Sequence, residues 1–475
     1  MSCKKSLLFY LFIIGFSTHV SRAQRAPGSF VAEAFVSGSS EDVLPFWLTA
    51  NQYGVQDPEG SNASARLAST VRGGETDGLA YRIGFDAVAR SGKSASLFLQ
   101  QLYGELSLGA IRLRAGRTEE RIGLVHPRLS IGSMTLSRNA APITKISISM
   151  PDFVDVPGTK GFVGFRGGLA NGWMSGNRVV KNAFVHEKYL FLRFGSSELP
   201  VRFNFGLTHF NNWGGTHMDP EIGELPSGFN DFLRVFFARP ADSSTVVESE
   251  TTNVLGNALG AYDGSFEFFF IPAVKLSMYH QFYLEDTVSL RLRSWRDGIW
   301  GIALEFENRP AGIRSVLWEH VYTKQQGSRS FERRGTDNYY NHVLYASGWT
   351  HRGRALGLPL ALTAEGFGGV INNILVAQHV GIEGMFAGRV RYTALITYSR
   401  NYGVHDYFDL ETLRHVETDL PLERRDQVSI LLDLRSRISS QYNLDGILRV
   451  AYDWGDLLPD NNLGLTLGVT HRADF

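Results

Sequence analysis

The feature that most constrains the fold is a set of segments in which apolar and polar residues alternate one by one. In the C-terminal segment 463–475, leucine or valine stands at positions 463, 465, 467 and 469, and glycine or threonine stands at the positions between them. Odd and even positions of a β-strand face opposite sides of the sheet, so this segment has one apolar face and one small or polar face. Segments 444–454, 428–438 and 390–398 repeat the pattern with charged residues on the second face. The chain therefore predicts an all-β protein.

Alternating strands occur in soluble β-sandwiches and propellers as well as in outer-membrane barrels. The segments here run to about ten to thirteen residues, whereas strands of soluble proteins usually have about five or six. Tyr452 and Trp454 end one apolar face, as aromatic residues do at a membrane interface. Phe475 ends the chain in register with the apolar face, which resembles the signal by which the barrel-assembly machinery recognises its clients. We therefore expect a transmembrane antiparallel β-barrel whose outer face contacts outer-membrane lipid.

The first 23 residues have the form of an export signal. Two lysines give a positively charged start, Leu7–Phe16 is a short apolar run, and Ser21-Arg22-Ala23 ends in the small-x-small pattern that signal peptidase accepts. The run is too short to span a bilayer. We expect cleavage near Ala23-Gln24, which leaves residues 24–475 as one barrel domain in a bacterial outer membrane.

The composition of the mature chain excludes several classes of function. The single cysteine, Cys3, is lost with the signal, which excludes a disulfide framework, a cysteine-ligated metal and a cysteine nucleophile. Loss of Lys4, Lys5 and Arg22 takes the 47 basic residues to 44, against 47 acidic residues. Binding a polyanion needs a basic excess on some face, so we expect no nucleic-acid partner.

Charged residues on the second face of the strands are expected to line the barrel lumen. Segments 288–295 and 299–308 flank Arg296-Asp297-Gly298 and predict a β-hairpin with a three-residue turn. A turn of that length puts the arginines of the first strand and the glutamates of the second on one face, whereas a two-residue turn would separate them. The charges that we expect in the lumen are Arg291, Arg293, Glu305, Glu307, Arg389 and Arg391.

The order of the strands predicts which connections lie on which side of the membrane. With Phe475 on the periplasmic side, the long polar segments 401–426 and 325–338 lie outside, and 308–312 and 351–357 are short periplasmic turns. Residues 211–258 show no sustained two-residue period and contain two helix-like stretches, 230–238 and 248–259. We predict that this insertion is a short helical plug, on the periplasmic side or within the lumen.

Strands in the first part of the chain are less regular in pattern. The candidates there are Leu79–Arg90, Leu97–Leu108, Ile111–Gly116, Phe162–Arg166, Glu187–Phe194 and Val201–His209.

Several motifs, in this order and spacing, resemble the capsule-assembly Wzi family in the form found in Bacteroidetes. They are Leu44-Pro45-Phe46-Trp47-Leu48 with Asn51-Gln52-Tyr53-Gly54, Gly116-Arg117 with Glu119-Glu120, His186-Glu187-Lys188-Tyr189-Leu190, His209 to Trp213-Gly214-Gly215, and Leu255-Gly256-Asn257 before Gly260-Ala261-Tyr262-Asp263. The resemblance runs over essentially the whole mature chain. It implies an outer-membrane barrel of about eighteen strands with periplasmic helices, acting as a lectin that holds capsular polysaccharide or exopolysaccharide at the cell surface. It implies no particular ligand residues.

Glycan binding needs aromatic faces that stack on sugar rings and polar groups that bond hydroxyls. The predicted external segments offer such residues, although exposed loops of any barrel are polar and contain aromatic residues. The candidates for polysaccharide binding are Tyr402, His405, Tyr407, Phe408, Arg333 and Arg334, the arginines being suited to an acidic polymer.

Other functions have weaker support in the sequence. His186-Glu187 opens like a zinc-protease helix, but Leu190 stands where the second histidine is needed, so we expect no metal and no cofactor. No nucleophile elbow, phosphate-binding loop or dinucleotide fingerprint is present, and we expect no enzymatic activity, although a surface hydrolase built from scattered residues stays open. The main alternative is a carbohydrate- or anion-permeable porin whose inward arginines set selectivity.

Overall fold

The computed structural model describes residues 27–475 apart from positions 76–77, 93–94, 243–249, 252, 272, 286–293, 308, 310, 328–336, 364–368 and 420–421. The predicted export signal, residues 1–23, therefore lies outside the described residues.

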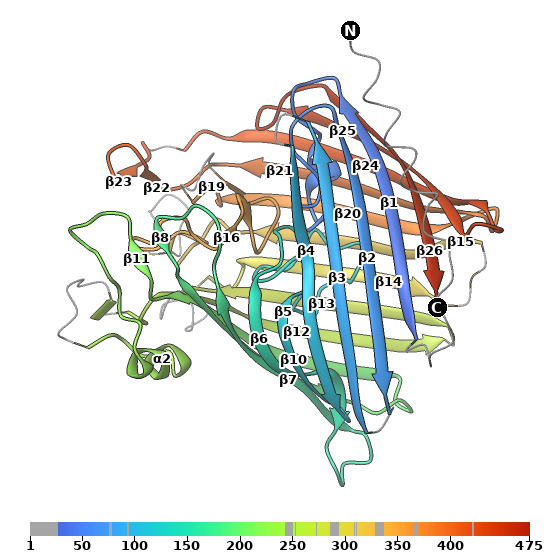
Figure 1. Ribbon diagram of the computed structural model, residues 1–475, viewed down its shortest axis with the longest axis horizontal. Helices are drawn as coiled ribbons and strands as arrows, with labels where there is room; N and C mark the ends of the chain where they lie inside the picture. The colour runs from blue at the N-terminus through green and yellow to red at the C-terminus, as the bar shows by residue number, and fades with distance from the viewer. Residues whose placement is uncertain are drawn as a thin grey trace, which may run out of the picture.

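The chain forms one closed barrel of 18 antiparallel strands (Figure 1). Each strand pairs with its neighbours along the chain, and the barrel closes where the first strand pairs with the last, Val31 opposite Arg472. The strands are β1 (Gly28–Ser39), β2 (Asn62–Gly74), β3 (Leu79–Ser91), β4 (Ser96–Leu108), β5 (Ile111–Arg117), β6 (Thr144–Asp155), β7 (Val163–Trp173), β9 (Phe184–Phe194), β10 (Val201–Trp213), β12 (Asn257–Ile271), β13 (Val274–Leu284), β14 (Gly298–Phe306), β15 (Gly312–Tyr322), β20 (Leu375–Phe386), β21 (Val390–Asn401), β24 (Arg425–Ser439), β25 (Leu444–Gly455) and β26 (Asn462–Asp474). The predicted barrel and its number of strands are confirmed.

Shorter elements lie in the connections between these strands. They are the paired segments β8 (Val180–Lys181) with β11 (Thr216–His217), β16 (Thr350–His351) with β17 (Arg354–Ala355), β18 (Leu362–Thr363) with β19 (Val370–Asn372), and β22 (Asp406–Asp409) with β23 (Arg414–Glu417), and the helices α1 (Phe46–Thr49) and α2 (Phe229–Phe236). No helix within the described ranges combines the length and the apolar character needed to cross a membrane.

The two faces of the strands differ as their sequences predict. On β26 the apolar positions 463, 465, 467 and 469 are exposed on the outside of the barrel, whereas Thr466 and Thr470 are buried inside it. On β25, Asp445, Arg449 and Asp453 are buried on the inner side. Apolar side chains therefore form the outer surface, which suits contact with lipid, and polar side chains face an enclosed interior. The six candidate strands of the first part of the chain correspond to β3, β4, β5, β7, β9 and β10.

The predicted hairpin of residues 288–295 with residues 299–308 is wrong. β14 pairs with β13 along one edge and with β15 along the other, so both edges of the second predicted strand are occupied by other partners. Residues 286–293 lie outside the described residues, and the neighbouring positions 294–297 form a turn. An apolar alternation alone could not tell which neighbour would pair with β14.

The connections differ in length at the two ends of the barrel. Both Gly28 and Phe475 lie at one end, which we call the terminus end, and short turns join the strands there. The long connections lie at the opposite end, the loop end, where α2, β8, β11, β22 and β23 project together, away from the C-terminus (Figure 1). By the sidedness that the sequence predicts, the loop end faces the cell exterior.

The insertion between β10 and β12 lies at the loop end and not at the end of Phe475. The prediction that this insertion is a periplasmic helical plug is therefore wrong. It counted residues 288–295 as a strand of a hairpin, and this extra strand placed the insertion at the opposite end of the barrel. The segment 351–357, predicted as a periplasmic turn, instead forms part of β16 and β17 inside the long connection 323–374, and His351 is buried there.

The lumen is occupied by largely irregular segments, with the short helix α1 among them. We call these segments the plug: α1 with the residues around it, the connection 118–143, and part of the connection 323–374. Trp349, Tyr340, Met134 and Leu129 form its buried apolar core. Trp349 Nε1 donates to the Thr135 carbonyl oxygen at 2.6 Å, and Tyr340 Oη donates to that of Met134 at 2.8 Å, which joins the two long connections. α1 packs against the inner face of β24 and β25.

Candidate functional site

A polar cleft lies at the loop end, where four connections meet. Its volume is about 220 Å³. Its lining comes from the insertion before β12 and the start of β12, from Glu285 just after β13, from the connection 323–374 and from the β22–β23 hairpin. The lining residues are Asn253, Val254, Gly256, Asn257, Ala258, Glu285, Asp337, Asn338, Asn341, His342, Val343, Asp406 and His415. We call this site the external cleft.

Hydrogen bonds hold the asparagines of the external cleft in place. Asn338 Nδ2 donates to the carbonyl oxygen of Asp406 at 3.0 Å and to its Oδ1 at 2.9 Å. Asn341 Nδ2 donates to the Val370 carbonyl oxygen at 2.8 Å, and its Oδ1 accepts the Val370 N–H at 2.8 Å. Because the first pair of bonds ties the connection 323–374 to the β22–β23 hairpin and the second pair braces the connection 323–374 internally, these polar groups are positioned before any ligand arrives.

Three titratable side chains at the cleft are shifted by their surroundings. Burial lowers the pKa of His342 to about 4, and the charge of His415 acts in the same direction. Burial raises the pKa of Glu250 to about 7, although its carboxylate accepts the Gly256 N–H at 2.7 Å. The pKa of His415 is raised by Asp406, whose Oδ1 lies 3.4 Å from Nδ1.

The donor set of the external cleft suits a ligand rich in hydroxyl groups. Amides, carboxylates and imidazoles each offer acceptors or donors in fixed planes, and a hydroxyl can both donate and accept. Asn257 Nδ2 is buried at the cleft without a hydrogen-bond partner among the described residues. Within the part of the chain that the structure describes, no three His, Cys, Asp or Glu side chains converge to hold a metal ion.

The residues predicted from sequence for polysaccharide binding lie beside the cleft and do not form one surface. Tyr407 is exposed, and Lys324 Nζ lies 4.2 Å from the ring centroid of Tyr402. His405 is buried, and Phe408 is buried against Val179 in a small apolar cluster under the β22–β23 hairpin. Phe408 therefore packs the hairpin onto the surface beneath it, and both side chains are largely covered. Arg333 and Arg334 lie outside the described residues.

Most of the asparagines of the cleft do not stand out in the sequence as ligand residues. Asn338, Asn341 and His342 stand close together at the end of the predicted external segment 325–338 and just after it, and this run is the signal that could have indicated them. Their meeting with Asn257 depends on pairing between segments far apart in the chain. A single sequence does not show that pairing.

The predicted lumen charges divide into three groups. Glu305 and Arg391 face the interior, where Glu305 Oε2 lies 2.5 Å from Lys275 Nζ and Arg391 lies 3.8 Å from Asp445. Glu307 and Arg389 are exposed in the turns that follow β14 and β20, beyond the ends of these strands. Arg291 and Arg293 lie outside the described residues.

The motifs that carry the family resemblance meet where the plug joins the barrel wall. Lys145 of β6 bonds both Glu120 and Glu187, which belong to two of the motifs. Asp263 Oδ1 accepts the Leu124 N–H of the plug at 3.0 Å. His186 Nδ1 lies 2.9 Å from Asn171 Oδ1 within the wall. These residues therefore connect strands and plug, which gives them a structural role.

Comparisons with solved structures agree with this architecture. Wzi of Escherichia coli, described as a carbohydrate-binding β-barrel involved in group 1 capsule assembly, is 14% identical with a TM-score of 0.57, and the match covers 92% of this chain and 83% of that one. At this identity the match shows the fold. OccK5 (OpdH) of Pseudomonas aeruginosa is 9% identical with a TM-score of 0.49, over 96% of this chain and 100% of that one.

Comparisons of the sequence give a family. No curated protein matched the chain. The family model of the capsule assembly protein Wzi matches residues 45–376, which is more than half of the chain and includes the plug and every lining residue of the external cleft except Asp406 and His415. The chain therefore belongs to the Wzi family of capsule assembly proteins.

Proposed function

We propose that this outer-membrane barrel is a non-enzymatic protein that binds capsular polysaccharide or exopolysaccharide through the external cleft and helps to assemble or anchor the capsule. The observation that carries the proposal is the position of the cleft: a preorganised set of amide, imidazole and carboxylate groups lies at the loop end. The carbohydrate binding described for the similar Escherichia coli barrel supports this function.

The filled lumen favours binding over conduction. A porin needs a continuous aqueous path between the two ends of the barrel, whereas here Trp349, Tyr340 and Leu129 form an apolar core inside it. The porin alternative therefore has less support. Export through the signal of residues 1–23, recognition of Phe475 by the barrel-assembly machinery and contact of the outer face with lipid complete the proposal.

A cell-based experiment tests the capsule role. A strain that lacks the protein is expected to lose cell-bound polysaccharide while secreting it in normal amount, because the anchor alone is missing. Immunoblots of the cell and medium fractions measure both amounts. An unchanged cell-bound fraction would contradict the proposal.

A binding experiment tests the cleft itself. Val343 is 61% exposed and its side chain lines the cleft, so Val343→Trp is expected to fill the space without disturbing the packing. Binding of the host's polysaccharide to the purified barrel, measured by surface plasmon resonance, should weaken at least tenfold. Glu411→Trp adds the same ring at the exposed tip of the β22–β23 hairpin, outside the cleft, and should bind as the parent does. Equal binding by both variants would exclude the cleft as the site.

A further inference from the structure

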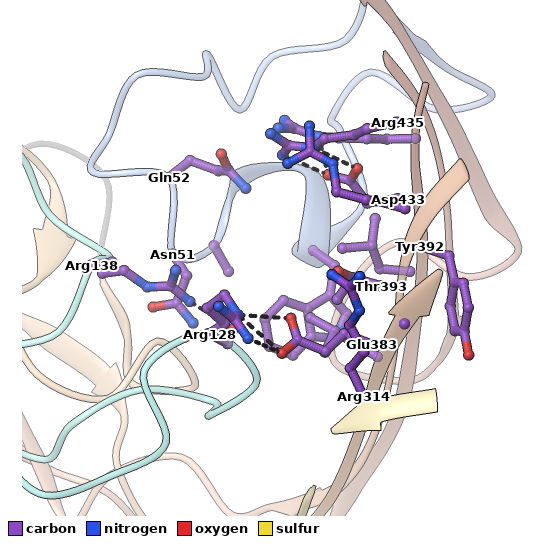
Figure 2. A pocket seen from close by; sticks show the side chains of 17 residues that line it. Asn51, Gln52, Arg128, Arg138, Arg314, Glu383, Tyr392, Thr393, Asp433 and Arg435 are labelled. Atoms are coloured by element: carbon purple, nitrogen blue, oxygen red, sulfur yellow. Dashed lines mark hydrogen bonds and ion pairs between the residues drawn. The ribbon is translucent and has the colours of Figure 1, made fainter. Parts of the chain in front are cut away.

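A second cavity lies inside the barrel near the terminus end. It has a volume of about 430 Å³, within the range of small-molecule sites, which is about 300–1,000 Å³. One side belongs to the plug, with Asn51, Gln52, Arg128 and Arg138, and the other to the wall formed by β15, β20, β21, β24 and β25 (Figure 2). The Tyr392 ring points away from the cavity (Figure 2). We call this site the arginine cavity.

The arginine cavity opens toward the terminus end. Arg314 and Arg391 stand at the start of β15 and β21, the ends of these strands that lie beside the termini. The side chains of Arg391 and Arg128 are 50% and 66% exposed, so solvent reaches the cavity from that end. The apolar core of the plug extends toward the loop end, where Trp349 packs against Phe210 of β10.

The lining carries more cations than anions. It contains the arginines Arg128, Arg138, Arg314, Arg391, Arg435 and Arg449, and only two carboxylates, Glu383 and Asp433. Glu383 accepts two bonds from Arg128 Nε, at 3.0 and 2.8 Å. Asp433 accepts Arg435 Nε and Arg449 Nε, each at 2.9 Å. Both carboxylates are therefore already paired within the cavity.

Two of the arginines bond only main-chain oxygens among the described residues. Arg138 Nη2 donates to the Arg128 carbonyl oxygen at 3.1 Å, and Arg314 Nε donates to that of Arg309 at 2.9 Å. Each guanidinium has five N–H donors, so both keep donors for a ligand. A planar guanidinium matches the two oxygens of a carboxylate or phosphate.

We propose that the arginine cavity is a binding site for an oxyanion group, the carboxylate or phosphate of a small polar ligand, which enters from the terminus end. Arg138 from the plug and Arg314 from the wall face the cavity from opposite sides and supply donors to the anion. The ligand therefore bridges plug and wall beside the Arg128–Glu383 pair, which already joins them. The site is separate from the external cleft and does not depend on its function.

Calorimetric titration of the purified barrel in detergent tests the proposal with three probes. An oligogalacturonate supplies carboxylates on a saccharide, inorganic phosphate supplies the anion alone, and a neutral oligosaccharide of similar length is the control. At least one anionic probe should bind, more weakly as ionic strength rises, because salt screens the charges. Which one binds identifies the source of the anion. Equal binding of the neutral oligosaccharide, or no binding of either anion, would overturn the proposal.

Variants assign the binding to the cavity. Arg138→Gln and Arg314→Gln should each weaken anion binding about tenfold or more, and Arg314→Lys should restore part of it. Arg112→Gln removes an inward arginine of β5, near the same end but outside the cavity, and should leave binding unchanged. Retained heat-modifiability on gels shows that each variant is folded. Loss of anion binding in Val343→Trp, or equal binding by Arg138→Gln and Arg112→Gln, would place the anion elsewhere and overturn the assignment.

Discussion

The buried carboxylate of Glu319 accepts the main-chain N–H of Ile131 at 2.8 Å, which joins β15 to a plug residue 188 positions earlier in the chain. The same carboxylate accepts Ser130 Oγ at 2.7 Å and the hydroxyl of Tyr279. A buried charge is tolerated only where such bonds replace its water. Here these bonds also fix the connection 118–143 inside the barrel, so the wall holds the plug.

Glu319→Ala is expected to loosen the plug. The change removes charge-assisted bonds worth about 1.5–3 kcal/mol each and leaves the Ile131 N–H without its partner. Planar-bilayer recordings should then show larger or more frequent current steps than the parent, whose filled lumen should pass little current. Glu307→Ala, in an exposed turn after β14, is the matched control and should behave as the parent. Indistinguishable traces for Glu319→Ala and the parent would show that Glu319 does not hold the plug.

The wall of the barrel could be predicted from the sequence, whereas the plug could not. The strands follow a two-residue period because successive side chains face lipid and lumen alternately, and this local pattern can be recognised in a single sequence. The plug has no period. Its segments are held by contacts such as Trp349 with Thr135, 214 positions apart, and no local pattern encodes such a contact. The helix-like segment 230–238 predicted α2 correctly, but its place depended on a strand count that the false hairpin had altered.

Leu432→Arg is expected to destabilise the barrel through its lipid contact. Leu432 lies in the middle of β24 with 39% of its surface exposed on the outer face. An arginine near the bilayer midplane costs about 2–4 kcal/mol, which falls toward zero at the interface. Urea unfolding in lipid vesicles measures the difference. Leu199→Arg, exposed in the turn between β9 and β10, should cost much less, and equal costs would contradict lipid contact at β24.

Lys145→Met is expected to be strongly destabilising. Lys145 lies between Glu120 and Glu187, and the Glu187 side chain is only 3% exposed. Removal of the cation leaves a buried carboxylate unpaired, which costs about 3–5 kcal/mol. The control is Arg112→Met, whose partner Asp152 is 82% exposed and can be hydrated, so the cost there is about 1 kcal/mol or less. Similar unfolding midpoints for the two variants would contradict the role of Lys145.

The candidate site was predictable in its place but not in its residues. The polar external segment 401–426 does reach the external cleft, through Asp406 and His415. Aromatic residues were favoured because sugars stack on them, yet the Phe408 ring packs beneath its own β22–β23 hairpin against Val179. Whether an aromatic side chain in a loop faces solvent or an adjacent loop is decided by long-range packing, which a single sequence does not contain.

His342 and Glu250 are expected to give the external cleft opposing responses to pH. The pKa of His342 is lowered from 6.5 to about 4 on folding, so its contribution to stability is complete above pH 6.5 and is lost as the pH falls toward 4. The pKa of Glu250 is raised from 4.5 to about 7, so its contribution is greatest below pH 4.5 and is lost as the pH rises toward 7. The two contributions largely cancel between about pH 4.5 and 6.5.

Single variants should separate these two contributions. Glu250→Gln leaves the response of His342, so the loops of the cleft should become more stable as the pH rises from 4.5 to 6.5. His342→Asn leaves the response of Glu250, so stability should fall over the same interval. Each change is at most about 3 kcal/mol. Hydrogen exchange of the amides around Tyr345 and Leu255, corrected for the intrinsic effect of pH, measures both. If stability changed with pH in the same direction in both variants, burial would not disfavour the charged form of at least one of these side chains.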